Sequence, residues 1–172
     1  LAQLVAAGQQ LLALLGVGGH GIQRVLQHQT RFAQLLLLQL TLLGGNDDDR
    51  ITWGHGDGAD TADGGDGNDV LEVSGTNGGD ALSIVANGLG GVIVTEQGGQ
   101  PAGVTAINIE EIKVTGSAGD DTFSATGNIA ALTHLTLDGG AGNDTINGGN
   151  GNDLLIGGDG DDTIDGNQGS DT

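Results

Sequence analysis

Residues 139–165 have the sequence GGAGNDTINGGNGNDLLIGGDGDDTID. The stretch consists of successive copies of a nine-residue unit, G-G-x-G-x-D-x-U-x, where U is a large apolar residue. Asp144, Asp153 and Asp162 occupy the sixth position of the copies, and an apolar residue follows each of them two positions later. A segment this rich in glycine and acid, without lysine or arginine, stays unfolded unless something offsets its charge. The regular apolar position nevertheless predicts a folded, repetitive structure.

Further copies of the unit lie elsewhere in the chain. They are residues 44–52 and 55–63, both degenerate, residues 64–72, complete, residues 116–124, with one glycine missing, and residues 166–172, which stop at the seventh position. Asp47 replaces a glycine in the first copy, and Ala62 replaces the large apolar residue in the second. Between the copies, residues 81–88, 91–98 and 104–116 alternate apolar with polar residues, which predicts short strands joined by tight turns in a parallel coil.

Composition narrows the possible partners. The 172 residues include 23 acids and 4 Lys or Arg, for a net charge of −19. This acidity excludes nucleic acid as a partner, since phosphate binding needs clustered basic residues, and it favours cations. The 36 glycines show no collagen period, and the absence of cysteine excludes disulfides and thiolate metal sites.

The first 46 residues contain no acid and are rich in Leu and Gln. Leu38–Thr52 aligns with Thr133–Asn147, so Leu40 and Leu42 are predicted to occupy strand positions. Residues 1–43 are interpreted as a cap or extra rungs, with a helix as an option for its first part; an oligomer contact and a lipid or processing role are the alternatives. No transmembrane segment is expected, because the apolar run 35–43 is shorter than the ~20 residues that cross a bilayer, and no signal-peptide pattern is found.

Three other motifs do not fit the sites that they suggest. GVGGHG at 16–21 fits a dinucleotide-binding pattern, but no acid follows it at the required distance. The four histidines are scattered without zinc-site spacing, and no EF-hand loop ends in the required Glu.

The nonapeptides resemble the RTX (haemolysin-type) calcium-binding repeat family of secreted bacterial proteins. The resemblance is close over 139–172 and 64–72, partial over 44–63 and 116–124, and absent over 1–37. It implies an all-β fold, a parallel β-roll or right-handed β-helix with Gly/Asp-rich turns. Each repeat would form a turn and a short strand, two repeats would form one rung, and Ca²⁺ would lie between turns of neighbouring rungs.

The physical chemistry of the unit supports this implication. Glycines permit positive φ and close backbone approach, and Ca²⁺ takes six to eight carboxylate and carbonyl oxygens. Carboxylates one strand spacing apart repel by roughly 3 kcal/mol at an effective dielectric near 20, whereas one buried Ile or Leu contributes only about 1.5–3 kcal/mol. The array at 139–172 is therefore predicted to be disordered without Ca²⁺ and to fold with it.

Stacking of every second repeat predicts the ligand pairs. These are Asp144 with Asp162, Asp153 with Asp171, Asp121 with Asp144 across an enlarged rung, and Asp49 with Asp69, where Trp53 and Gly54 are interpreted as an insertion. Asp60 is a further candidate ligand for which this spacing supplies no acidic counterpart. The carbonyls expected to complete the sites are those of Gly139, Gly140, Gly142, Gly148, Gly149, Gly151, Gly157, Gly158 and Gly160.

The expected organisation has four parts: the N-terminal segment 1–43, degenerate repeats at 44–72, irregular rungs at 73–138 and calcium-binding repeats at 139–172. The sequence predicts a non-enzymatic, extracellular bacterial protein that binds several Ca²⁺ ions. It would be part of a surface layer, adhesin, biofilm matrix or filament, with end-to-end self-association. The alternatives are the non-catalytic RTX portion of a secreted enzyme or toxin and, less favoured, a polysaccharide-active β-helix, for which the chain has few aromatic or basic residues.

Overall fold

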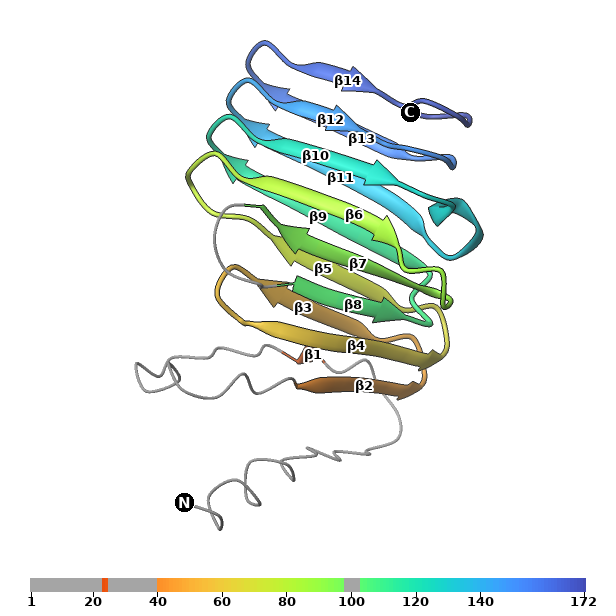
Figure 1. The fold of residues 1–172 in the computed structure, drawn as a ribbon. Helices are drawn as coiled ribbons and strands as arrows, with labels where there is room; N and C mark the ends of the chain where they lie inside the picture. Colours follow the sequence, from red (N-terminus) through yellow and green to blue (C-terminus); the bar gives the residue numbers. More distant parts are fainter. Residues whose placement is uncertain (1–22, 25–39, 98–102) are drawn as a thin grey trace.

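Two facing β-sheets make up the protein in the computed structural model, which describes residues 23–24, 40–97 and 103–172 (Figure 1). The six-stranded sheet contains, in spatial order, β1 (Gln23–Arg24), β3 (Arg50–Gly54), β5 (Val70–Ser74), β9 (Glu111–Ala118), β11 (His134–Ala141) and β13 (Leu154–Asp159). The eight-stranded sheet contains β14 (Thr163–Asp165), β12 (Thr145–Asn147), β10 (Thr122–Thr126), β6 (Ala81–Ala86), β7 (Gly91–Glu96), β8 (Gly103–Ile107), β4 (Ala59–Asp66) and β2 (Thr41–Asn46). A short 3-10 helix, η1 (Ile129–Ala131), precedes β11.

Alternation of apolar and polar residues places one face of each sheet in a shared core. In the six-stranded sheet, the buried side chains of Leu71, Ile112 and Leu135 are register partners on successive strands. In the eight-stranded sheet, Phe123 pairs with Ile146. The core is therefore a set of apolar stacks that run along the coil between the sheets.

Successive nonapeptides alternate between the two sheets, so two repeats form one rung. Ile146 pairs in parallel with Ile164, 18 residues later. This confirms the predicted all-β parallel β-roll and its rung length at the C-terminal end.

The rung between Asp121 and Asp144 contains 23 residues, because the chain makes a longer connection through η1 before β11. Thr122 nevertheless pairs with Thr145 in a parallel register. The enlarged rung therefore preserves the predicted stacking of the turns on either side of it.

The segment 81–107 departs from the expected parallel coil. Its strands were predicted, but β7 is antiparallel to both β6 and β8. The turn between β6 and β7 contains Gly88 and Gly90 at positive φ, and the Asn87 side chain accepts the N–H groups of Leu89 and Gly91 at 2.7 and 3.0 Å. Such a tight turn reverses the chain within one sheet instead of leading it across to the other.

Trp53 and Gly54, interpreted as an insertion in the spacing between Asp49 and Asp69, lengthen β3 to five residues, whereas β12 and β14 of the regular repeats have three each. Trp53 lies inside β3, is 3% exposed and pairs with Val73 of β5. Period-two alternation from the buried Ile51 directs it into the core. The chain turns directly after β3, where the Asp57 N–H donates to the Gly54 carbonyl at 3.1 Å.

Most of the N-terminal segment, residues 1–22 and 25–39, lies outside the described residues, and so does its predicted cap role. Residues 23–24 form β1, which pairs in parallel with β3. Leu42 is buried in β2, and Leu40 packs against the core just before that strand. Among the described residues, no helix has the length and apolar character needed to span a bilayer.

Phe123→Ala is expected to lower the free energy of unfolding by about 3–5 kcal/mol, because it leaves a cavity beside Leu82 and Ile146. Leu89→Ala, at a turn residue that is 91% exposed, is the control and should change it by less than about 0.5 kcal/mol. Denaturant unfolding followed by circular dichroism measures both values. Equal effects of the two substitutions would contradict this core assignment.

Candidate metal centre

The sixth-position aspartates lie in two columns of turns, one along each edge where the sheets meet (Figure 1). The first turn column leads from the eight-stranded into the six-stranded sheet and contains Asp49, Asp69, Asp153 and Asp171. The second turn column leads back and contains Asp80, Asp121, Asp144 and Asp162, and Asp60 lies just beyond the corresponding turn, at the start of β4. Where two such turns lead into neighbouring strands, their carboxylates lie one strand spacing, about 4.8 Å, apart.

A ladder of hydrogen bonds joins the aspartates of the second turn column. The Asp80 N–H donates to Asp121 Oδ1 at 2.7 Å, the Asp121 N–H to Asp144 Oδ1 at 2.7 Å, and the Asp144 N–H to Asp162 Oδ1 at 2.9 Å. The structure thus brings Asp144 beside Asp162 and Asp121 beside Asp144, and that each pair shares an ion stays a prediction.

The first turn column contains the same contact at both of its ends. The Asp49 N–H donates to Asp69 Oδ1 at 2.7 Å, and the Asp153 N–H donates to Asp171 Oδ1 at 3.0 Å. Both predicted pairs are thus brought together. Between them, the turns before β9 and β11 lack the glycine-rich unit.

The second carboxylate oxygen, Oδ2, is buried and has no hydrogen-bond partner in Asp69, Asp121, Asp144 and Asp153. These four residues are between 0% and 3% exposed. A buried charged oxygen without a partner carries a desolvation cost of several kcal/mol unless it is protonated or meets a cation. The four orphan oxygens therefore call for a proton or a metal ion.

The first glycine of each repeat keeps open the space into which Oδ2 points. A Cβ added to Gly116 would overlap Asp121 Oδ2 and would lie 2.5 Å from the carbonyl oxygen of Gly139 in the next turn. At Gly139 itself, the added Cβ would overlap Asp144 Oδ2 and lie 2.7 Å from the carbonyl oxygen of Gly157. An unpartnered carboxylate oxygen and a carbonyl oxygen of the next turn thus lie beside the same glycine.

Four of the other predicted carbonyl ligands contact the next turn of the coil. The Gly140 carbonyl lies against Gly158, the Gly142 carbonyl against Gly160, and the Gly151 carbonyl against Gly169. The Gly149 carbonyl accepts the Gln168 N–H at 3.1 Å. For the carbonyls of Gly148, Gly158 and Gly160, the ligand role stays a prediction.

Burial raises the pKa of the Asp69, Asp121 and Asp153 carboxyls above the ordinary value of 3.8, and hydrogen bonds from backbone N–H groups oppose part of this effect. The carboxylates that raise these pKa values further are Glu110 beside Asp69, Asp144 beside Asp121, and Asp171 beside Asp153. The surroundings of these three carboxyls thus disfavour their charged form.

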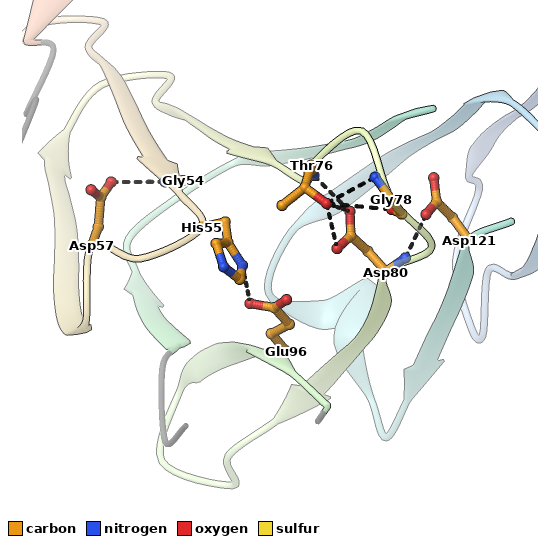
Figure 2. A network of polar contacts seen from close by, with 8 residues as sticks. All are labelled: Gly54, His55, Asp57, Thr76, Gly78, Asp80, Glu96 and Asp121. Atoms are coloured by element: carbon orange, nitrogen blue, oxygen red, sulfur yellow. Dashed lines mark hydrogen bonds and ion pairs between the residues drawn. The ribbon is translucent and has the colours of Figure 1, made fainter. Parts of the chain in front are cut away.

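Asp80 was missed in the sequence, although G-T-N-G-G-D-A-L at 75–82 retains two of the three glycines of the unit, the aspartate and the apolar residue. This copy starts at Gly75, two residues later than a repeat that directly continued 64–72, so it was not recognised as a copy. Figure 2 shows its carboxylate held within its own turn: the Thr76 N–H donates to Oδ2 at 2.6 Å, and the Thr76 hydroxyl lies 3.1 Å from Oδ1. Asp80 is thereby satisfied by its own turn, unlike Asp121 beside it.

Asp60 stands apart from the aspartates of the second turn column. Its carboxylate accepts the Leu40 N–H at 3.0 Å, and its register partner on β8, the neighbouring strand of the sheet, is Val104. The hairpin of β7 and β8 separates it from Asp80. Its role as a metal ligand stays a prediction.

The donor set fits a hard cation. Within the described ranges, no three acidic or histidine side chains gather into a metal-binding cluster. Each candidate site instead combines carboxylates from two turns with backbone carbonyls, the mixture of oxygen ligands that Ca²⁺ takes. Zinc, which favours nitrogen and sulfur, fits this donor set less well.

The comparisons with known proteins point to the same ion. A family model described as the RTX calcium-binding nonapeptide repeat matches residues 56–82 and 138–172, in four copies. The comparison with curated proteins found no match.

Gly116→Ala is expected to lower the free energy of unfolding by about 1–3 kcal/mol, because the new methyl group occupies the space of Asp121 Oδ2 and the Gly139 carbonyl. Gly54→Ala is the matched control, since its Cβ would meet only Asp57 Oδ2, at 3.8 Å. Denaturant titration in the presence of metal tests the pair. A Gly116 variant as stable as the control would show that the turn accommodates a methyl group beside Asp121 Oδ2 without strain.

The raised pKa values predict how the metal-free protein responds to pH. A raised carboxyl pKa contributes stability that is fully present below 3.8 and is lost as the pH rises through the folded-state value. The melting temperature in metal-free buffer should therefore rise as the pH is lowered from about 7 to about 5. Asp121→Asn should reduce this rise, and an unchanged or falling melting temperature in the wild type would contradict the prediction.

Proposed function

We propose that the two turn columns bind several Ca²⁺ ions that hold the β-roll together, on the premise that residues 56–82 and 138–172 match the model of the RTX calcium-binding nonapeptide repeat. The observation that supports this proposal most directly is the set of four buried, unpartnered Oδ2 oxygens. The pairs that would hold the ions, each with one carbonyl, are Asp121 and Asp144 with Gly139, Asp144 and Asp162 with Gly157, Asp153 and Asp171 with Gly166, and Asp49 and Asp69 with Gly64.

Electrostatics supports a folding role for the ions. The repulsion between successive carboxylates is about 3 kcal/mol per pair at an effective dielectric near 20, and it recurs along a chain of net charge −19. A divalent ion shared by two turns replaces this repulsion with attraction to both carboxylates. Binding energy then adds to the stability of the fold.

The apolar core indicates which part of the protein depends most on the ions. Of the buried apolar side chains among the described residues, only Ile146 lies beyond residue 138. Leu154, Ile156 and Ile164 in the last rungs are 42%, 40% and 45% exposed. Residues 139–172 thus have little apolar burial to offset their charge, whereas residues 42–137 contain a continuous core.

We place this calcium-stabilised β-roll outside a bacterial cell, as a non-enzymatic structural segment of a surface layer, adhesin, biofilm matrix or filament. Abundant extracellular Ca²⁺ suits weak, multiple oxygen sites of this kind. End-to-end association of copies, through backbone edges that a coil leaves exposed, is part of this proposal. A role as the non-catalytic part of a secreted enzyme or toxin would use the same calcium-stabilised roll.

Removal of Ca²⁺ with a chelator is expected to unfold residues 139–172 while the core around β5, β9 and β11 retains structure, because the two regions differ in apolar burial. Far-UV circular dichroism should show a partial loss of β signal that returns with added Ca²⁺, and Mg²⁺ serves as the control ion. Hydrogen exchange then locates the change. Unaltered protection of residues 139–172 in chelator would refute the proposed function.

A further inference from the structure

The turn between β8 and β9, residues 108–110, stands in the first turn column directly after the turn that contains Asp69. It has the sequence Asn-Ile-Glu, lacks the Gly-Gly pair, and lies outside the residues that match the repeat family. Nothing in the spacing of the nonapeptides marks it as a metal-binding turn. Its contacts nevertheless reproduce those of a repeat.

Glu110 occupies the place of a sixth-position aspartate. The Asp69 N–H donates to Glu110 Oε2 at 2.8 Å, as the Asp121 N–H donates to Asp144 Oδ1 at 2.7 Å. The Asp69 carbonyl accepts the N–H groups of Glu110 and Glu111, each at 3.1 Å. The longer glutamate side chain thus makes the turn-to-turn contact from a turn with fewer residues.

Asn108 supplies the matching carbonyl. A Cβ added to Gly64 would overlap both Asp69 Oδ2 and the Asn108 carbonyl oxygen, so the two oxygens lie beside the same glycine. The Gly139 carbonyl has this place beside Asp121 Oδ2 in the second column. Asn108 adopts a φ of 50°, and its side-chain amide donates to Asp63 Oδ1 at 2.8 Å, which fixes the orientation of its backbone.

Asp69 provides the independent sign of a ligand. It is 0% exposed, its Oδ1 accepts the Asp49 N–H, and its Oδ2 has no partner. The charged groups that act on it are Glu110, Asp49 and Asp48, all of them negative. A cation is the ligand that this arrangement of charges and lone pairs recognises.

We propose that Asp69, Glu110 and the Asn108 carbonyl form a Ca²⁺ site of hybrid origin, half repeat and half irregular turn. The inference rests on the proposed function, because it assumes that the repeat turns bind Ca²⁺. The site joins turns whose acidic residues are 41 positions apart in the chain. A bound ion would therefore stabilise the pairing of β5 with β9, two strands that β6, β7 and β8 separate in the chain.

The test is calorimetric titration of the full chain with Ca²⁺, comparing the wild type with Glu110→Gln. Glutamine keeps an oxygen to accept the Asp69 N–H but removes the charge, so the variant should fold and should bind one Ca²⁺ fewer or bind one at least tenfold more weakly. Glu111→Gln is the matched control: the adjacent side chain contacts Lys113 and Thr136, and its substitution should leave the number of ions unchanged. Asn108→Gly, which keeps the carbonyl and tolerates positive φ, should also retain the site.

A second variant guards against misfolding and against the rival explanation, in which Asp69 holds a proton rather than a metal. Asp69→Asn should reduce the rise in melting temperature that Ca²⁺ induces by more than Asp49→Asn, which alters only the Asp49–Asp69 pair. An equal or smaller effect than that of Asp49→Asn would contradict the hybrid site, and an unchanged rise would show that Asp69 holds a proton. A wild type that binds no Ca²⁺ overturns the proposed function itself. A wild type that binds Ca²⁺ with the same isotherm as Glu110→Gln overturns this site alone.

Discussion

The contact between successive turns, from the backbone N–H of one acidic residue to the carboxylate of the next, is the interaction on which the other features of this protein depend. It uses one carboxylate oxygen and leaves the second one buried against the next turn, as in Asp121 and Asp144. The first glycine follows from this geometry, because any side chain there would displace that oxygen. A cation follows as well, since the stacked carboxylates repel one another in a poorly solvated space.

The three antiparallel strands β6, β7 and β8 make the two turn columns unequal. Of these, β7 and β8 lie in the eight-stranded sheet with no counterpart in the six-stranded one, and they separate Asp60 from Asp80. In the first column, β5 and β9 remain direct neighbours, so the turn at Asp69 still meets an acid in Glu110. An insertion that interrupts one edge of a coil therefore leaves the other edge continuous.

Apolar burial and charge are distributed unequally along the coil. The middle rungs contain Leu71, Ile112 and Leu135 in one uninterrupted stack, while the last rung ends on the half-exposed Ile164. Apolar burial thus stabilises the middle rungs more than residues 139–172. The turn that contains Asp80 is the first of four neighbouring turns in the second column. Its carboxylate accepts hydrogen bonds from Thr76 of the same turn, so this turn needs no ion (Figure 2).

The sequence alone determined the features that follow from a local period. A nine-residue unit with one apolar position predicts two repeats per rung, and therefore the pairs Asp144 with Asp162 and Asp153 with Asp171. It also predicts parallel strands and an oxygen-only site. These features depend on spacing along the chain, which is visible without a structure.

The tertiary structure alone decided which distant turns meet. Asp80 with Asp121 and Asp69 with Glu110 are each 41 residues apart, and both contacts depend on β7 running antiparallel and returning the chain beside β4. The structure also decided that Trp53 points into the core from β3. The physical reason is that a turn binds whichever turn the sheet places one strand spacing away, and beyond the regular repeats that neighbour is set by the path of the whole chain.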